Sequence, residues 1–245
     1  MVEDGPGAGV ARRCECQEAG YSDRLLELAG IPPRYRVCSL DNFTHEHSDA
    51  GIRQHLLAAR TLCARFVDEF LDLEGGFRDS GLLLVGPTGT GKTHLAAAVL
   101  AELIRRYRVH GRFIDCTTLV QEIQATFDPD SAASKGDLLR PVIDAEVLVL
   151  DELGAQKPTP WVVDLLYYVL NTRYTQRLPT LFTTNFHLDP PQKEANLDAT
   201  PDAWSPDRLS SRLPGMLVSR LYEMARPVEL WGVVDFRRTY KAHRH

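Results

Sequence analysis

Short apolar runs alternate with stretches of helical periodicity between about residue 80 and residue 231. The sequence predicts five strands, at residues 82–85, 112–115, 147–151, 180–184 and 228–231. The three central strands are almost wholly apolar, as strands buried on both faces of a parallel sheet must be. Helices are predicted between the strands, at residues 92–107, 118–126 and 160–174. This alternation is typical of an α/β fold in which helices cover a parallel sheet.

Further elements flank this pattern. Residues 49–73 have apolar side chains at helical spacing, so we expect a helix that packs against the sheet. A helix start at residues 205–207 and an interruption at Pro214-Gly215 predict two short helices that end near residue 224. Residues 188–203 are rich in proline, acids and alanine, and they are predicted to form a surface loop.

Composition narrows the class of protein. The chain has 245 residues, of which 44% are apolar and 25% charged, as in ordinary soluble globular proteins. The N-terminus is acidic and glycine-rich, and no run is long enough to span a membrane, so we expect a cytoplasmic protein without a membrane partner. Five scattered cysteines, an odd number, predict reduced thiols. The net charge of −5 argues against a protein coated in nucleic acid, so any DNA contact should be local.

An octapeptide joins the first predicted strand to the helix that follows it. It reads Gly86-Pro87-Thr88-Gly89-Thr90-Gly91-Lys92-Thr93. Glycines allow consecutive backbone N–H groups to turn inward around an oxyanion, and the new helix directs its positive end to the same place. Lys92 adds a charge that should reach the β and γ phosphates, and the Thr93 hydroxyl should ligate magnesium. The strand, loop and helix together predict a nucleoside triphosphate site, with ATP and Mg²⁺ as ligands.

Polar residues end the third and fourth predicted strands. Asp151 and Glu152 follow four apolar residues, at the edge of the sheet where parallel strands bind their ligands. Asp151 is predicted to hold magnesium, directly or through water, and Glu152 to polarise the water that attacks the γ phosphate. Asn185 is predicted to orient that water through its amide. The alternative is that Asn185 caps the strand and starts a turn.

These motifs together resemble a known family, the minimal AAA+ ATPases, which comprises bacterial replicative helicase loaders of the DnaC and DnaI type and the IstB transposition helpers. The segments that carry the resemblance are residues 29–35, 40–43, 86–96, 150–155, 159–161, 173–174, 183–185 and 219–224. The resemblance implies a P-loop NTPase of the ASCE class, with a three-layer α/β/α fold and a five-stranded parallel sheet. It implies that strand 180–184 lies between the first and third strands, which would place Asn185 beside Lys92 and Glu152. Because only about fourteen residues follow the last predicted strand, no C-terminal lid domain is expected.

The family works as a ring or spiral of subunits. This implies that an arginine of one subunit reaches the γ phosphate bound by its neighbour and stabilises the transition-state charge. Arg220 matches that position best, and Arg212 is the nearby alternative. For either arginine, an ion pair on the helix surface is the other interpretation. Arg237 corresponds to an arginine that such proteins use near the phosphates from the C-terminal side.

The resemblance also implies contacts with partners. In the loaders the N-terminal region grips the helicase, and the core contacts single-stranded DNA through a segment that corresponds to residues 113–127. Phe113 would offer a stacking face and Arg112 a phosphate contact, although Phe113 also fits a core position. His94 is interpreted as a solvated side chain. Cys116 is interpreted as a small buried residue rather than a nucleophile.

One feature departs from the family. Many members carry an N-terminal zinc module with a Cys-x-x-Cys pair and a Cys-x-Cys pair, and here only Cys14-Glu15-Cys16 remains, so no zinc is expected. We expect residues 1–45 to form a short, partly disordered N-terminal region that is a candidate partner-binding segment. Residues 46–245 would form the ATPase domain.

The sequence favours an ATPase that loads a replicative helicase. An IstB-like helper of a transposase is the nearest alternative, because it shares the same ATP chemistry. A P-loop phosphotransferase would need an acceptor pocket and a basic lid, and we identify neither in the sequence. A nucleotide-binding adaptor would bind ATP without turnover.

Overall fold

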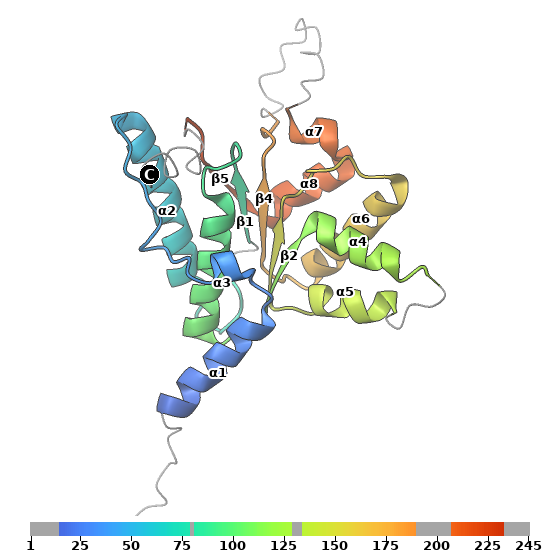
Figure 1. Ribbon diagram of the computed structural model, residues 1–245, viewed down its shortest axis with the longest axis horizontal. Helices are drawn as coiled ribbons and strands as arrows, with labels where there is room; N and C mark the ends of the chain where they lie inside the picture. The colour runs from blue at the N-terminus through green and yellow to red at the C-terminus, as the bar shows by residue number, and fades with distance from the viewer. Residues whose placement is uncertain (1–14, 79–80, 129–133, 190–206, 233–245) are drawn as a thin grey trace, which may run out of the picture.

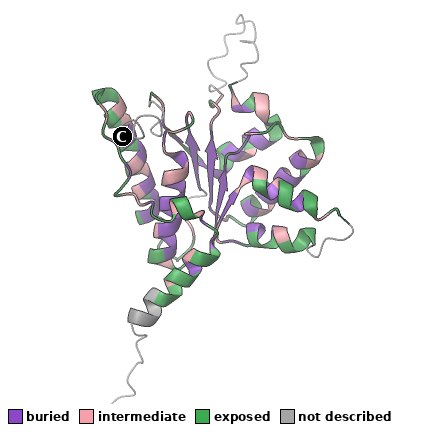
Figure 2. Cartoon of the chain, viewed as in Figure 1, coloured by how far each residue is buried: buried purple, intermediate pink, exposed green. Residues whose placement is uncertain are grey.

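The computed structural model describes residues 15–78, 81–128, 134–189 and 207–232, with side chains from residue 20 onward. Its centre is a five-stranded sheet in the order β2-β3-β4-β1-β5, in which every neighbouring pair is parallel (Figure 1). The strands are β1 (Gly81–Val85), β2 (Gly111–Asp115), β3 (Val147–Asp151), β4 (Thr180–Thr184) and β5 (Arg226–Glu229). β1, β3 and β4 are buried at every position (Figure 2), which accounts for their lack of charged residues before the end of β3.

Helices cover both faces of this sheet. They are α1 (Glu15–Leu28), α2 (Ala50–Asp68), α3 (Lys92–Tyr107), α4 (Cys116–Ala125), α5 (Lys135–Ile143), α6 (Pro160–Thr175), α7 (Leu209–Arg212) and α8 (Gly215–Met224), with a short 3₁₀ turn at Pro33–Tyr35. α2 and α3 lie on one side of the sheet, and α4, α5, α6 and α8 lie on the other (Figure 1). The result is the three-layer α/β/α fold that the resemblance implies. None of the helices in the described part of the chain is long and apolar enough to cross a membrane.

Alternate residues of the buried strands serve two separate apolar clusters. Val147 and Val149 of β3 pack with α2 and α3, whereas Leu148 and Leu150 pack with α4, α5, α6 and α8. This division follows from the two-residue period of a strand, which points successive side chains to opposite faces. It also explains why these strands read as continuous apolar runs rather than as alternating ones.

The strand order confirms one implication of the resemblance, because β4 lies between β1 and β3. The predicted position of the fifth strand is wrong by two residues. β5 pairs with β1 from Arg226 to Glu229, not over residues 228–231. β5 is an edge strand whose only buried residue is Val228. A search for apolar runs therefore misses its polar start.

Two helices are missing from the sequence prediction. α1 precedes the segments that the prediction treated as structured, and at its end Leu25 is buried in the core. α5 contains Pro141, which interrupts the usual helical pattern. The helix nevertheless has a clear start, because Ser134 and Asp137 form a capping box with reciprocal hydrogen bonds.

Two predicted helices begin at residues other than those expected. The helix predicted at 118–126 begins at Cys116, because the Asp115 carboxylate caps it by accepting a backbone N–H at 2.8 Å. The last helical region forms two short helices as predicted, but the first begins at Leu209. The loop predicted at residues 188–203 lies mostly outside the described residues.

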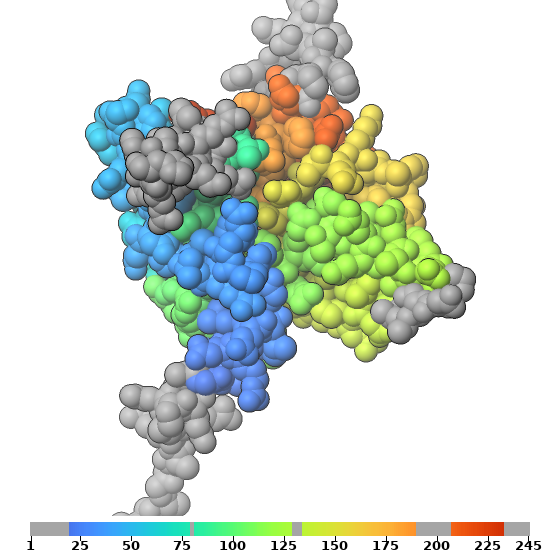
Figure 3. Space-filling view, viewed as in Figure 1, coloured from blue at the N-terminus to red at the C-terminus, as the bar shows by residue number. Residues whose placement is uncertain are grey.

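The described N-terminal residues pack into the layer that contains α2 and α3. Ala29, Ile31 and Phe43 are buried there, and the Phe113 N–H of β2 donates to the Ala29 carbonyl at 2.7 Å. Because β2 is an edge strand, this contact covers part of an otherwise open edge. Residues 20–49 are called here the N-terminal segment. In the space-filling view this segment lies between α2 and α4 (Figure 3). The domain boundary at residue 45 stays a prediction.

Arg173 of α6 is fully buried, with 0% of its surface exposed. Its guanidinium donates to Thr180 Oγ1 at 2.9 Å and to four carbonyl oxygens at 2.6 to 3.2 Å. The carbonyl groups belong to Val142, Ile143, Ala145 and Pro179. Burial lowers the pKa of Arg173 to about 9. This side chain therefore joins the end of α5 and the turn before β3 to the start of β4.

We expect Arg173→Met to lower the free energy of unfolding by about 2–4 kcal/mol, because four buried carbonyl groups would lose the hydrogen bonds that Arg173 donates to them. Urea denaturation followed by circular dichroism would measure the change. Arg177→Met, at the exposed turn after α6, is the control and should change stability by less than about 0.5 kcal/mol. Equal losses in the two variants would contradict this role of Arg173.

Candidate functional site

The loop between β1 and α3 turns through two glycines with positive φ angles, 85° at Gly89 and 94° at Gly91. Gly91 also occupies the N-cap position of α3, and a Cβ there would lie 2.6 Å from Phe43 Cε2. Position 91 therefore requires glycine for both its conformation and its lack of space. Because α3 begins directly after the loop, its unpaired N–H groups and helix dipole favour an anion at this place.

Lys92 lies inside this loop and is 6% exposed. Its ammonium group donates to the Pro87 carbonyl at 2.7 Å, and the Thr90 hydroxyl donates to the same oxygen at 2.9 Å. The ammonium is therefore fixed beside the backbone groups of the loop. A charge in this position is poorly screened by water and would attract phosphate oxygens strongly. The geometry fits the phosphate-binding role predicted for residues 86–93.

Asp151 ends β3 and is 6% exposed. Its Oδ1 accepts a hydrogen bond from the Thr93 hydroxyl at 3.0 Å and another from the Thr183 hydroxyl at 2.6 Å. Burial raises the pKa of Asp151, and the two hydroxyl hydrogen bonds oppose that rise. Thr93 and Asp151 thus present adjacent oxygen donors of the kind that Mg²⁺ prefers. These two residues fit a magnesium ion whose other ligands would be phosphate oxygens and water.

Glu152 and Asn185 line one cavity of about 550 Å³ together with Lys92 and Thr183. Glu152 is exposed to this cavity and has a left-handed backbone with φ of 57°. Its N–H donates to Thr183 Oγ1 at 2.9 Å. The structure therefore brings together three parts of the chain. They are residues 86–93, called here the phosphate loop, the acid pair Asp151-Glu152, and the Asn185 amide at the end of β4. Thr183 lies in the segment 183–185 that carries the resemblance, but the sequence predicts no role for its side chain, although its place two residues before Asn185 on a buried strand was an available signal.

The N-terminal segment supplies another wall of the cavity, a role that the sequence does not predict. Tyr35, Asn42, Phe43 and His47 all line it. Their positions follow from contacts between this segment and the phosphate loop, since Phe43 packs against Gly91. A ligand in the cavity would therefore contact the N-terminal region as well as the sheet edge.

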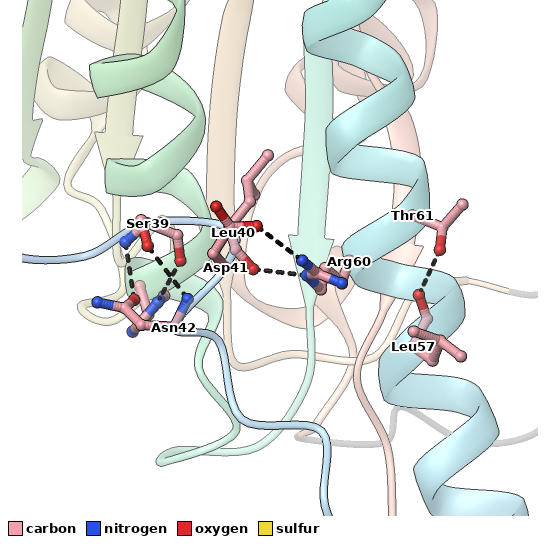
Figure 4. A network of polar contacts seen from close by, with 8 residues as sticks. Ser39, Leu40, Asp41, Asn42, Leu57, Arg60 and Thr61 are labelled. Carbon is pink, nitrogen blue, oxygen red and sulfur yellow. Dashed lines mark hydrogen bonds and ion pairs between the residues drawn. The ribbon is translucent and has the colours of Figure 1, made fainter.

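α2 holds this N-terminal wall in place. Arg60 donates through Nε to the Leu40 carbonyl at 2.6 Å and through Nη2 to Asp41 Oδ1 at 2.9 Å (Figure 4). Ser39 and Asn42 close the turn around these residues. The Ser39 N–H donates to Asn42 Oδ1 at 2.8 Å, and the Asn42 N–H donates to Ser39 Oγ at 3.1 Å (Figure 4).

His94 is not the solvated side chain that the sequence suggested. Its Nε2 lies 3.0 Å from the Ser39 carbonyl oxygen, and its ring packs edge-on against Phe43 with 5.6 Å between the centroids. Burial lowers the pKa of His94. The residue therefore links the first turn of α3 to the N-terminal wall.

Phe113 and Cys116 are both buried. The sequence predicts burial for Cys116, and it gives a core position as one of two interpretations of Phe113. Phe113 is 4% exposed and Cys116 is 8% exposed, and burial raises the pKa of the Cys116 thiol to about 12. Phe113 stacks on Tyr35 with 6.5 Å between the ring centroids. Because its ring is enclosed in the core, Phe113 does not offer the stacking face for single-stranded DNA that was its alternative role.

The two candidate trans arginines have different surroundings. Arg212 donates to the Gly154 carbonyl at 3.1 Å and to the Ala155 carbonyl at 2.9 Å, and it lies over the Phe186 ring. Its guanidinium therefore ties the end of α7 to the turn that follows the acid pair. This contact within the chain occupies two of its donors.

Arg220 of α8 lies over the Tyr174 ring, 3.9 Å from the centroid, and forms an ion pair with Glu223 at 2.7 Å. The Arg220 side chain is 21% exposed, and its partners Glu223 and Tyr174 are 49% and 41% exposed. Arg237 and Cys14 fall outside the described residues, and the side chain of Cys16 is not described. Among the described residues there is no group of three or more histidine, cysteine or acidic side chains suited to a metal ion. The zinc and Arg237 expectations stay predictions.

The sequence of this chain is similar to those of known proteins. A family model described as IstB-like ATP binding protein matches residues 53–199. YqaM of Bacillus subtilis strain 168 is 28% identical over 184 residues, which cover 73% of this chain and 56% of YqaM. The replicative helicase loader DnaC of Escherichia coli strain K12 is 29% identical over 168 residues, which cover 68% of this chain and 62% of DnaC. The chain thus matches less than two thirds of the length of these relatives.

A solved structure agrees with the sequence comparisons. The crystal structure of the DnaC helicase loader superposes with a TM-score of 0.62 at 29% identity, and the match covers 81% of this chain and 99% of that one. The similarity therefore extends through the layers that surround the cavity, and not only through the phosphate loop.

We expect Gly91→Ala to weaken the binding of Mg-ATP by at least about tenfold, because the left-handed turn would be strained by about 1 kcal/mol or more and Phe43 would be displaced. Isothermal titration calorimetry would measure the affinity. Gly215→Ala is the control, since a Cβ there meets nothing within 4 Å. Unchanged affinity in Gly91→Ala would contradict the steric argument.

Proposed function

The chain belongs to the family of IstB-like ATP-binding proteins, and we propose that it is an ATPase that binds and hydrolyses Mg-ATP. The observation that carries this proposal is the arrangement of Lys92, Glu152 and Asn185 around one cavity. The hydrogen bond between Thr93 and Asp151 beside that cavity supports it further. Each of these residues has a chemical task in the hydrolysis of a phosphoanhydride.

The proposed reaction is the transfer of the γ phosphoryl group to water. The loop N–H groups and Lys92 would hold the phosphates, and Thr93 and Asp151 would hold Mg²⁺, which would neutralise charge on the phosphate oxygens. Glu152 would accept a proton from the attacking water as its oxygen bonds to the γ phosphorus. The bond from that phosphorus to the bridging oxygen would break, and ADP would leave. The Asn185 amide would orient the water.

Arg220 is the arginine that we propose to act on a neighbouring subunit. It sits at the surface of α8 against Tyr174 and Glu223, whereas Arg212 already donates to two carbonyl groups of its own chain. A guanidinium at the γ phosphate of a neighbour would accelerate hydrolysis by about 10³- to 10⁵-fold. This role requires that the subunits assemble into a ring or spiral.

We propose that the ATPase loads a replicative helicase onto single-stranded DNA in the cytoplasm. The supporting observations are the identity to DnaC of Escherichia coli and the likeness to the crystal structure of the DnaC helicase loader. ATP binding would close the interfaces between subunits, and hydrolysis would release the helicase and the DNA. Residues 1–45 are the proposed helicase-binding segment.

Phe127 is the aromatic residue that we propose for the local contact with single-stranded DNA. It lies just after the end of α4, is 58% exposed, and packs edge-on against Trp161 with 5.3 Å between the centroids. An exposed ring that packs against a neighbouring side chain can stack on any of the four bases, so this contact would not depend on the DNA sequence. Phe127 belongs to the segment that the resemblance assigns to DNA contact, and unlike Phe113 it is accessible.

A second role is favoured by the family match itself. The model that matches residues 53–199 is described as IstB-like, and IstB proteins are the transposition helpers of the family that the sequence resembles. The same ATP chemistry would then remodel DNA for a transposase. The two roles differ in the protein partner, and not in the residues of the cavity.

We expect Glu152→Gln to bind Mg-ATP with unchanged affinity but to lose at least about 100-fold in kcat, because an amide does not accept the proton of the attacking water. Calorimetry and phosphate release would measure the two quantities. Glu122→Gln, an exposed position on α4, should leave both unchanged. Full turnover in Glu152→Gln would exclude this residue as the base. Strict dependence of wild-type turnover on a small acceptor would indicate a phosphotransferase.

We expect the full chain, with ATP present, to co-elute in size-exclusion chromatography with the replicative helicase of its own cell. Lys92→Ala should abolish the complex if assembly requires bound nucleotide. Gly215→Ala is again the control. Co-elution with a transposase and not with the helicase would support the transposition role instead.

A further inference from the structure

The Thr183 side chain lies between the two acids of the site. Its hydroxyl donates to Asp151 Oδ1 at 2.6 Å and accepts the Glu152 N–H at 2.9 Å. Thr183 is 1% exposed, so water does not compete for these contacts. Because a hydroxyl has one proton to donate, the direction of both hydrogen bonds is fixed. One buried group is therefore shared by the proposed magnesium ligand and the backbone of the proposed base.

The main chain of Thr183 also binds the turn that follows β3. Its carbonyl oxygen accepts the Leu153 N–H at 2.8 Å. The ladder between β3 and β4 pairs residues only as far as Leu150 and Phe182. Beyond that point the side-chain and main-chain oxygens of Thr183 replace the ladder and bind two consecutive N–H groups.

The turn that Thr183 holds is not one that the backbone adopts easily. Glu152 has a φ of 57°, in the left-handed region that non-glycine residues rarely occupy. Such a conformation persists only where surrounding contacts determine it. The two oxygen atoms of Thr183 supply two of these contacts, and carbonyl groups of the same turn accept hydrogen bonds from the Thr184 hydroxyl and the Ala155 N–H. They direct the chain so that Glu152 is exposed to the cavity, whereas Asp151 stays buried beside it.

Thr183 also lies close in the sequence to Asn185, whose amide follows the end of β4. Thr183 and Asn185 are two residues apart, and both line the cavity. The side chain that fixes the acids and the amide that would orient water thus come from the same edge of β4. Their relative placement is set by the extended backbone between them.

We propose that Thr183 is a positioning residue for ATP hydrolysis, whose hydroxyl fixes Glu152 relative to Asp151. This inference rests on the ATPase activity proposed above and assigns part of its geometry to one buried hydroxyl. Thr183 does not contact the reacting atoms. It acts by holding the carboxylate that would bind the metal and the turn that presents the base.

Thr184 provides a closely matched control. Its hydroxyl is also buried, donates to the Leu153 carbonyl at 2.9 Å and accepts the Phe186 N–H at 3.3 Å. Replacing either threonine with valine therefore removes one donated and one accepted hydrogen bond from the same strand. Only the Thr183 variant removes contacts with the acid pair.

We expect Thr183→Val to lower kcat by about 10- to 100-fold with the KM for ATP changed less than about threefold, because the base is misplaced while the phosphate loop is intact. Thr183→Ser, which restores the hydroxyl, should recover kcat to within about threefold of wild type. Thr184→Val should lower the Tm by a similar amount to Thr183→Val but leave kcat within about twofold. If Thr183→Val does not fold, Thr183→Ala removes the same hydroxyl and is judged by the same criteria.

Hydrogen exchange of the chain without nucleotide gives a readout that does not depend on turnover. The Glu152 amide should exchange about tenfold faster in Thr183→Val than in wild type or Thr183→Ser, because its acceptor is gone. Equal kcat losses in Thr183→Val and Thr184→Val, or unchanged exchange at Glu152, would overturn the inference. An inactive wild-type chain would instead overturn the proposed ATPase, and the positioning role with it.

Discussion

The placement of β4 between β1 and β3 is the constraint on which the rest of the site depends. With all three strands parallel, the turns that follow them emerge side by side at one edge of the sheet. The phosphate loop follows β1. Asp151 ends β3 and Glu152 follows it, while Thr183 and Asn185 lie at the end of β4. Hydrogen bonds cross between these turns, since the Gly86 N–H donates to the Thr184 carbonyl at 3.2 Å and Thr183 binds Asp151. No loop has to bend across the sheet to assemble the chemistry.

Threonine hydroxyl groups anchor β4 at both of its ends. Thr180 accepts a hydrogen bond from Arg173 at the start of the strand, and Thr183 and Thr184 bind the turn after β3 at its end. These residues are buried, so each hydroxyl needs a partner within the protein. The central strand is therefore held by polar contacts as well as by the two apolar layers. Polar contacts have defined directions, and this fixes the position of the strand along its axis more closely than apolar packing does.

The sequence predicts the parts of the site that are local in the chain. The phosphate loop and the Asp151-Glu152 pair each follow an apolar strand, so their surroundings can be inferred from neighbouring residues. The order of the strands does not follow from periodicity, and it came from the resemblance to a family. Phe43, His94 and Thr183 owe their roles to contacts between residues 31 to 55 positions apart. Amino-acid composition and residue spacing do not predict such contacts.

The helices, too, were predicted correctly where the signal is local in the sequence. α3 and α6 were predicted almost to the residue because they are long and periodic, whereas α5 is short and contains a proline. β5 was displaced because an edge strand needs only one apolar face. In each case the error lies where a tertiary contact or an exposed surface replaces the pattern expected of a buried element.

The shared contact between Phe43 and the phosphate loop has a practical consequence for anyone who divides this chain into pieces. A fragment that started at residue 46 would keep both sequence motifs intact, yet its cavity would lack the side formed by Tyr35 and Phe43. It would also uncover the apolar surface beneath Ala29 and Ile31. Failure of such a fragment to bind nucleotide would be explained by the missing wall, and it would not test the partner-binding role proposed for residues 1–45.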